Sequence, residues 1–108
     1  MYKPKYLYVI CEANTAPVKI GFSADPEKRL KQLQTGHPAQ LTLFHKEEVA
    51  AVQVRGLEKA IHNQLRHKRQ QGEWFALSPE DAVFEIKHAL IRYGDIENLS
   101  ARLRSRTI

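Results

Sequence analysis

Five side chains of this chain could take part in catalysis or ligand binding: a phenol, an amine, a guanidinium, a carboxylate and an imidazole. A guanidinium can bind two phosphate oxygens at once, and a single carboxylate can hold a divalent cation that keeps most of its water. A phenol or an amine beside them can help to move a proton from an attacking water. Together these groups suit the binding and cleavage of a phosphodiester. They are Tyr8, Lys19, Arg29, Glu58 and His62.

The phenol and the amine belong to two segments with the composition of strands. Residues 6–12 are aromatic and β-branched, and residues 18–22 alternate apolar side chains with small or charged ones. Residues 13–17 lie between them and carry turn residues, which predicts an antiparallel hairpin with a loop rather than a tight two-residue turn. Because side chains alternate along a strand, Tyr8 and Lys19 can share one face.

Helix signals occur at three other places. Asp25-Pro26 and Ser78-Pro79 each combine a capping side chain with a proline that fits the first helical position. We expect helices over 26–34, 52–67 and 79–93, a third strand over 41–49 and a short extended piece over 74–75. This order predicts an α/β (α+β) fold, with a small, largely antiparallel sheet of three strands and about three flanking helices.

Helix geometry separates two charged residues from their neighbours. On the helix over 52–67, Glu58 lies about 55° from the centre of the apolar stripe. A carboxylate at that edge of the core is partly desolvated, so either a cation approaches it or its pKa rises. On the helix over 26–34, Arg29 lies about 70° from the apolar centre, whereas Lys28 is nearly opposite it. Arg29 and Glu58 therefore border the core.

Length and charge limit the classes of protein to consider. The chain has 108 residues, which is the size of one small domain. Its 17 Lys and Arg against 12 Asp and Glu give a net charge of +5, with a pI of about 9.5. This balance favours a polyanionic partner such as nucleic acid. We expect one domain over 1–93, followed by a basic tail over 94–108.

Cysteine content and hydropathy give further limits. Cys11 is the single cysteine, which excludes an internal disulfide and a cysteine-based zinc cluster and suits a reducing compartment. No apolar run approaches the roughly 20 residues needed to cross a bilayer. We therefore expect a soluble, cytoplasmic protein that does not enter a membrane.

Several short motifs occur along the chain in an order that is typical of a known family. They are Tyr6-Leu7-Tyr8, Val18-Lys19-Ile20-Gly21, Pro26-Glu27-Lys28-Arg29-Leu30, Leu57-Glu58, His62 and Gly72-Glu73-Trp74-Phe75. Their order and spacing resemble the GIY-YIG nuclease domain, and their details resemble its T5orf172 branch, over about residues 5–90. Each motif alone is a weak signal, but the set is fairly specific.

The resemblance implies a divalent-metal-dependent endonuclease that hydrolyses DNA phosphodiester bonds. In that family the residue matching Tyr8 stands near the attacking water, and the residue matching Arg29 holds the scissile phosphate. The residue matching Glu58 binds one divalent cation, Mg²⁺ or Mn²⁺. A lone carboxylate is sufficient for Mg²⁺, which keeps several waters and takes its other ligands from phosphate.

Two positions depart from the family pattern. The first-motif glycine is Tyr6 here, and the second-motif tyrosine is Lys19. Lys19 either supplies a cation that activates Tyr8, accepts the proton itself, or binds phosphate without taking part in the chemistry. His62 is interpreted as a proton shuttle or phosphate contact, with a structurally satisfied histidine as the alternative. Glu73 is a rival metal ligand, which we interpret instead as a structural anchor.

Two other functions use the same scaffold. One is a catalytically weak or inactive module that binds DNA or RNA through its basic side chains, and the other is a small protein-interaction protein. A bare catalytic domain has little sequence selectivity, so selectivity would come from a structured substrate, a homodimer or a partner protein. The sequence leaves these alternatives open.

Overall fold

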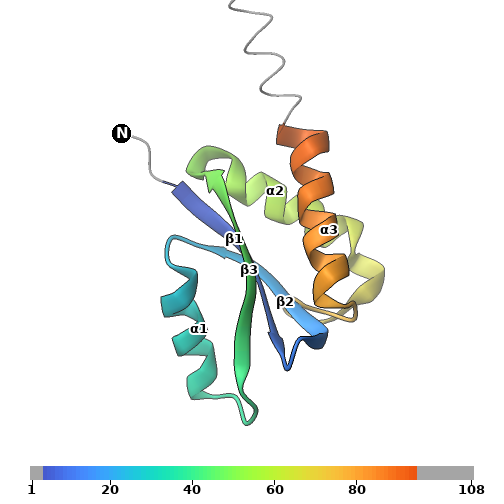
Figure 1. Ribbon diagram of the computed structural model, residues 1–108. Helices are drawn as coiled ribbons and strands as arrows, with labels where there is room; N and C mark the ends of the chain where they lie inside the picture. The colour runs from blue at the N-terminus through green and yellow to red at the C-terminus, as the bar shows by residue number, and fades with distance from the viewer. Residues whose placement is uncertain (1–3, 95–108) are drawn as a thin grey trace, which may run out of the picture.

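The computed structural model describes residues 4–94 of the chain. They form one α+β body in which a central sheet lies between helices (Figure 1). Within this described part, no helix combines the length and the apolar character needed to cross a membrane. Most of the basic tail expected over 94–108 lies outside the described residues.

The sheet is fully antiparallel, has five strands and follows the order β3-β1-β2-β5-β4. The predicted α+β class and the antiparallel character are confirmed, but the sheet has two strands more than the three expected. The additional strands are very short, and β4 consists of three exposed residues without any apolar alternation, so no pattern marks it. The strands are β1 (Pro4–Glu12), β2 (Thr15–Ser23), β3 (Leu41–Ala50), β4 (Arg69–Gln71) and β5 (Trp74–Phe75).

The connection between β1 and β2 is a tight turn, so the expected longer loop is wrong. Only Ala13 and Asn14 separate the two strands, and both have positive φ, 46° and 56°. Two residues of this conformation match the right-handed twist of the flanking strands. Asn tolerates it readily, whereas Ala gives no sequence signal for it. The pairing becomes irregular next to the turn, between Cys11 and Glu12.

The three expected helices are present. Asp25 Oδ1 accepts the Lys28 N–H at 3.1 Å, and Ser78 Oγ accepts the Asp81 N–H at 3.1 Å, so both predicted caps are formed. The second helix ends earlier than expected and is followed by a 3₁₀ turn, and the third ends in a π-helical turn. The helical elements are α1 (Pro26–Thr35), α2 (Ala51–Gln64), η1 (Arg66–Lys68), α3 (Pro79–Ala89) and η2 (Leu90–Gly94).

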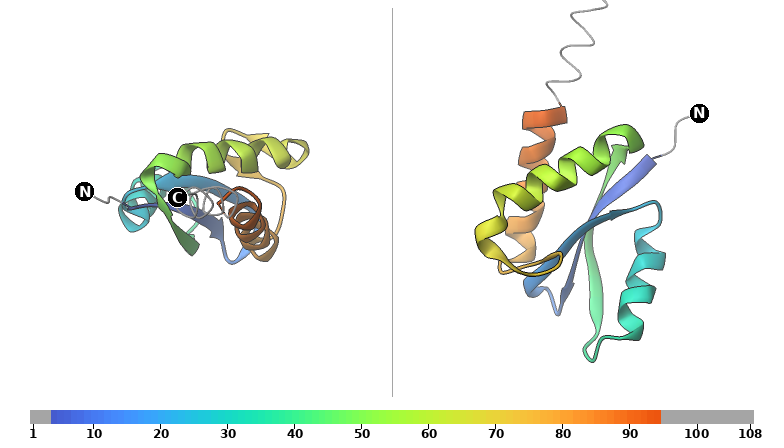
Figure 2. Two further views of the ribbon diagram at one scale, coloured as in Figure 1. Left: turned by 90° about the horizontal axis from the view of Figure 1, so that it is seen from above. Right: turned by 180° about the vertical axis from the view of Figure 1, so that it is seen from behind.

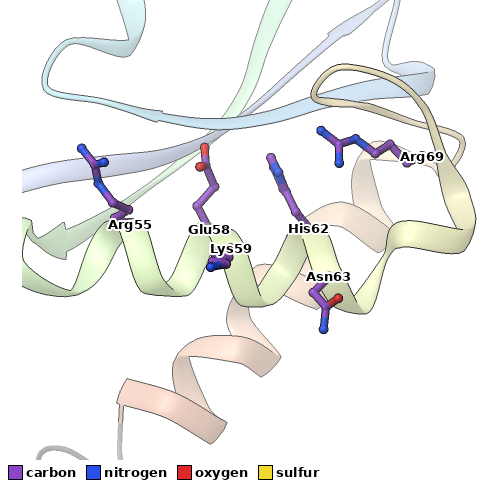
Figure 3. Close-up of a pocket in the computed structure, with 6 residues that line it drawn as sticks. All are labelled: Arg55, Glu58, Lys59, His62, Asn63 and Arg69. Carbon is purple, nitrogen blue, oxygen red and sulfur yellow. The ribbon is translucent and has the colours of Figure 1, made fainter.

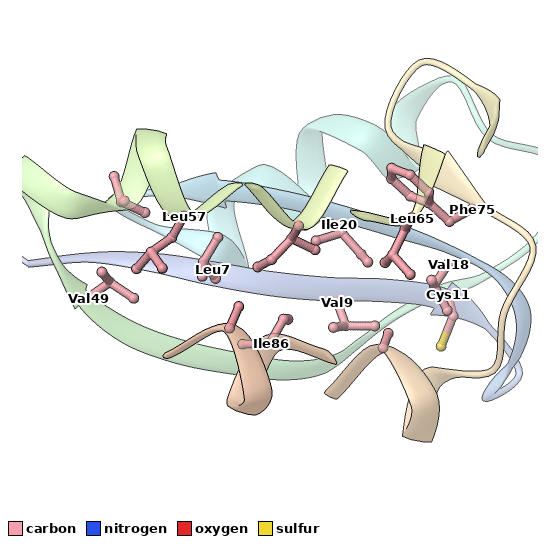
Figure 4. Packing of buried hydrophobic residues seen from close by; sticks show 14 residues of the cluster. Leu7, Val9, Cys11, Val18, Ile20, Val49, Leu57, Leu65, Phe75 and Ile86 are labelled. Carbon is pink, nitrogen blue, oxygen red and sulfur yellow. The ribbon is translucent and has the colours of Figure 1, made fainter. Parts of the chain in front are cut away.

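Two apolar clusters join the helices to the sheet. Helix α1 lies on one side of the sheet, whereas α2 and α3 lie on the other (Figures 1 and 2). The larger cluster contains Leu7, Val9 and Ile20 from the strands together with residues of α2 and α3 (Figure 4). The smaller cluster lies under α1 and includes Tyr8 and Ile10. The strands therefore use both faces for packing, with side chains alternating as predicted.

The larger cluster, the main core of the protein, leads us to predict different effects on stability for substitutions at two positions of α2. Ile61 is 1% exposed within the larger cluster, whereas Val52 is 90% exposed. We expect Ile61→Ala to lower the free energy of unfolding by about 2–5 kcal/mol, because it leaves a cavity. Val52→Ala should change it by less than about 0.5 kcal/mol. Urea denaturation measures both, and equal losses in the two variants would contradict this packing.

Candidate active site

The candidate site lies along the part of β2 that β5 leaves uncovered. Strand β5 pairs only with Val18 and Lys19. Beyond it, the Ile20 N–H still bonds to the Glu73 carbonyl at 3.1 Å, but no other strand within residues 4–94 pairs with this part of β2. Side chains of α2 reach this edge of the sheet: Glu58 and His62 project from the helix toward β2 (Figure 3).

Tyr8 lies directly over Gly21 within the sheet. The two residues are paired in the β1–β2 register, and Tyr8 is 1% exposed. A Cβ atom at position 21 would lie 2.5 Å from Tyr8 Oη and 2.9 Å from Glu73 Oε1. Only glycine therefore leaves room for the phenol. The same distances show that the phenol and the Glu73 carboxylate both lie close to this point.

Lys19 is the single buried charged side chain in residues 4–94, with 9% of its surface exposed. Its Nζ lies 3.5 Å from Glu73 Oε1 and 5.6 Å from the centre of the Trp74 ring. An ammonium in so dry a place needs an opposite charge, and Glu73 supplies it. Lys19 and Tyr8 lie on the α1 side of the sheet. Tyr8 and Ile10 both belong to the cluster under α1, and Lys19 is paired with Ile10, so its side chain lies on the same face.

Glu58 lies beside the second carboxylate of the site. Its side chain is half-buried, and the Glu73 carboxylate lies close to it. Burial and the neighbouring Glu73 charge raise the pKa of Glu58 to about 7, although Arg55 and Lys19 oppose the rise. The desolvation expected from its place at the edge of the apolar stripe is therefore present. Near neutral pH, the two carboxylates can hold a shared proton or a cation between them.

Arg29 reaches the site from the opposite side of the sheet. It follows the Asp25 cap on α1, and its guanidinium lies close enough to the Tyr8 phenol to favour the ionised form of that phenol. Its Nη1 also lies 3.5 Å from Gln32 Oε1. Burial raises the pKa of Tyr8 above its usual value, and the nearby Arg29 guanidinium only partly offsets this rise. The phenol thus remains a hydrogen-bond donor at neutral pH.

His62 bonds to the uncovered edge of β2. Its Nε2 lies 2.8 Å from the Ile20 carbonyl oxygen, and because a carbonyl can only accept, Nε2 must carry a proton. The ring packs against Phe75, with 4.9 Å between the ring centres. These contacts fix the position of the imidazole and satisfy a backbone acceptor for which no strand is present. Nδ1 is the ring nitrogen that is left for a role in chemistry.

Glu73 connects the residues that the sequence analysis singled out. It contacts Lys19 and Glu58, and it lies with Tyr8 above Gly21. We interpreted it as a structural anchor, and the structure gives it this wider set of partners. The available signal was its place in the Gly-Glu-Trp-Phe motif, where Gly72 adopts a positive φ of 59° and turns β4 into β5.

The carboxylates fit a hard divalent cation better than zinc. In residues 4–94, no group of three His, Cys, Asp or Glu side chains is arranged to hold a metal ion. A structural or catalytic zinc site needs at least three such ligands. Mg²⁺ and Mn²⁺ accept one or two carboxylates and complete their coordination with water and phosphate oxygens. Glu58 with Glu73 matches this second pattern.

Comparison with known families identifies the class of protein. The T5orf172 domain model matches residues 5–90. The chain therefore belongs to the T5orf172 domain family, as the sequence motifs indicated. The family is consistent with a nuclease-like or DNA-binding role. Comparisons with curated proteins and with solved structures found no match.

The high pKa of Glu58 makes stability depend on pH. Between about pH 4.3, the value of a free glutamate, and the folded pKa, the folded protein binds more protons than the unfolded chain. Its stability therefore falls as pH rises and is lowest once Glu58 is ionised above about 7. We expect Glu58→Gln, measured with a chelator present, to be more stable than wild type at pH 8 and to lose this advantage toward pH 5.

Chemical denaturation across this pH range gives the measurement. Glu80→Gln is the control, since Glu80 is exposed on α3 and outside the site. Its stability curve should run parallel to that of wild type. If the Glu58→Gln curve is also parallel, the burial argument for Glu58 is wrong.

The Tyr8–Gly21 contact predicts opposite effects of the same substitution at two glycines. Gly21→Ala should lower the free energy of unfolding by about 1–3 kcal/mol, because the methyl group overlaps a buried, rigid ring. Gly56→Ala places its methyl group in open space on α2, where alanine is the better helix former, and should raise stability by about 1 kcal/mol. Urea denaturation of both variants tests the contact, which a stabilising Gly21→Ala would disprove.

Proposed function

We propose that this protein is a GIY-YIG-type endonuclease that hydrolyses DNA phosphodiester bonds with one divalent cation. The observation that carries the proposal is the convergence of a guanidinium, a phenol, an ammonium and two carboxylates on the uncovered edge of β2. The net charge of +5 and the membership of the T5orf172 domain family support a DNA substrate.

Glu58 would hold the cation, Mg²⁺ or Mn²⁺, with Glu73 within reach as a second oxygen ligand. The half-buried pair supports this assignment, because a cation would replace the proton that the two carboxylates otherwise share. When bound, the ion would polarise the phosphate and offset negative charge on the leaving oxygen. A pair of carboxylates leaves most coordination positions to water and substrate.

Arg29 would hold the scissile phosphate. A guanidinium remains charged at any working pH and can bind two phosphate oxygens as negative charge develops. Its place beside Tyr8 supports this assignment, since it brings the phosphate site next to the phenol. Tyr8, with its raised pKa, would orient the attacking water as a donor and acceptor of hydrogen bonds rather than remove its proton.

Lys19 would act as a fixed positive charge in place of the second-motif tyrosine. Its contacts with Glu73 and Trp74 support this role over that of a mobile proton acceptor. His62 would position β2 through Nε2 and offer Nδ1 to a phosphate or a proton. Tyr8, Lys19, Arg29 and His62 thus act on the substrate and on the protons, while Glu58 acts through the cation.

A binding module without cleavage is the second candidate function. One observation favours it. Burial raises the pKa of Tyr8, so the phenol keeps its proton near neutral pH and cannot act as a base. The Lys19 side chain is already paired with Glu73. Such a module would bind DNA or RNA in a salt-sensitive manner.

We expect purified protein to cleave DNA only with Mg²⁺ or Mn²⁺, and Glu58→Ala or Arg29→Ala to reduce the rate by at least about 100-fold. The reason is that each substitution removes a group that stabilises charge in the transition state. Supercoiled, linear, branched and single-stranded DNA are incubated with each protein, and products are quantified on gels. Circular dichroism shows whether each variant remains folded.

Two matched variants serve as controls. Lys28→Ala removes an exposed cation next to Arg29, and Glu80→Ala removes an exposed carboxylate on α3. Both should cleave like wild type. Cleavage by a folded Glu58→Ala protein would show that the metal assignment is wrong. Salt-sensitive binding without cleavage, under every divalent ion, would favour the binding module instead.

A further inference from the structure

A hollow of about 490 Å³ lies along α2 next to the candidate active site. It is open to solvent and shares two of its lining residues, Glu58 and His62, with that site. Its other lining residues are polar or charged and come from α2 and from β4. The complete lining is Arg55, Glu58, Lys59, His62, Asn63 and Arg69 (Figure 3).

Positive charge predominates in this hollow. Arg55, Lys59 and Arg69 contribute three cations, whereas Glu58 is the one acidic residue in the lining. Cations of like sign on one wall repel each other unless an anion lies between them. An anionic ligand is therefore the chemistry that the hollow fits. Its exposed, polar lining does not suit an apolar ligand.

The two guanidiniums lie at opposite ends of the hollow. Arg55 projects from the first half of α2, and Arg69 points back into the same space from beyond the end of that helix (Figure 3). Arg69 is held in place, because its Nε donates to the Gly72 carbonyl in the β4–β5 turn. Its two terminal nitrogens are the part of the fork left for a ligand.

The spacing fits a strand of nucleic acid better than a single phosphate. Arg55 and His62 are seven residues apart on one helix, which corresponds to roughly 10 Å along its axis. One phosphate group cannot span that length. A DNA strand carries a phosphate at every nucleotide, with a rise of roughly 3.4 Å along the duplex axis, so it offers more than one phosphate over that length.

We propose that this hollow, which we call the Arg55–Arg69 groove, binds the phosphate backbone of the DNA strand next to the cleaved bond. The inference rests on the proposed function and adds to it the path of the strand along α2, away from Arg29. Arg55 and Arg69 each bind a phosphate through two N–H groups. These contacts do not depend on the base sequence of the DNA, because the phosphate backbone is the same at every nucleotide.

Binding without cleavage tests the groove. Fluorescence anisotropy of a short fluorescein-labelled DNA duplex, with a chelator present, gives the affinity over a series of salt concentrations. Each lost phosphate contact should reduce the slope of log affinity against log salt by about 0.9. We expect this reduction in Arg55→Gln and in Arg69→Gln, and a larger one in the double variant. Thermal melts show whether each variant keeps its fold.

Two further variants distinguish a groove from a general loss of charge. Arg66→Gln removes an exposed arginine that does not line the groove, three residues before Arg69. It should keep the wild-type slope. Arg55→Lys keeps the positive charge and leaves the contacts of Arg69 unchanged. Its slope should therefore be closer to that of wild type than the slope of Arg55→Gln is.

The outcomes separate this inference from the proposed function. Reduced slopes in the two groove variants support the groove, whether or not the protein cleaves DNA. Unchanged slopes, or an equal reduction in Arg66→Gln, overturn the groove even if wild-type protein cleaves. Absence of binding to the duplex by wild type also overturns it. Failure of the proposed function appears separately, as absence of metal-dependent cleavage.

Discussion

The register of the β1–β2 hairpin is the constraint on which the rest of this structure depends. It sets Tyr8 opposite Gly21, so a residue without a side chain makes room for the phenol. The same register points Lys19 to the side of the sheet on which α1 carries Arg29. Shifting it by one residue would turn every side chain of the strand to the other face and bury the ammonium among the apolar residues of α2 and α3. The register is set by the two-residue turn at Ala13 and Asn14 together with the irregularity beside it: Glu12 pairs with Thr15, whereas Cys11 pairs with Val18.

The charges of the site oppose one another within a small, partly dry volume. Glu73 stabilises the Lys19 ammonium and at the same time disfavours ionisation of Glu58. Folding alone would be better served by an apolar residue or a single ion pair at this place. A cluster that lowers stability and is nevertheless built from three separate elements is typical of a site kept for function. The main core, which lies on the other side of the sheet from α1, provides the stability that tolerates it.

Local signals predicted the fold well, and long-range contacts were what they missed. The caps at Asp25 and Ser78, the alternation of β1 and β2 and the apolar stripe of α2 each depend on residues close in sequence. The prediction of a longer loop between β1 and β2 was wrong because alanine does not mark a positive φ, and β4 was missed because it carries no pattern. For the site, strand and helix geometry placed Tyr8 with Lys19 and Glu58 at the core edge. The central position of Glu73 depends on β2, α2 and the Gly72 turn meeting in space, which no spacing in the sequence reveals.

The order of the strands also has a consequence for encounters between copies of this chain. Strand β3, ten residues long, forms one edge of the sheet, and the opposite edge is the three-residue β4. A long edge offers unpaired backbone groups on which a second chain can add a strand. The second half of β3 carries the charged residues Lys46, Glu47 and Glu48. Lys46 Nζ forms an ion pair with Glu27 Oε1 of α1 at 2.7 Å. Charges on the long edge and brevity on the other thus protect the sheet from edge-to-edge aggregation.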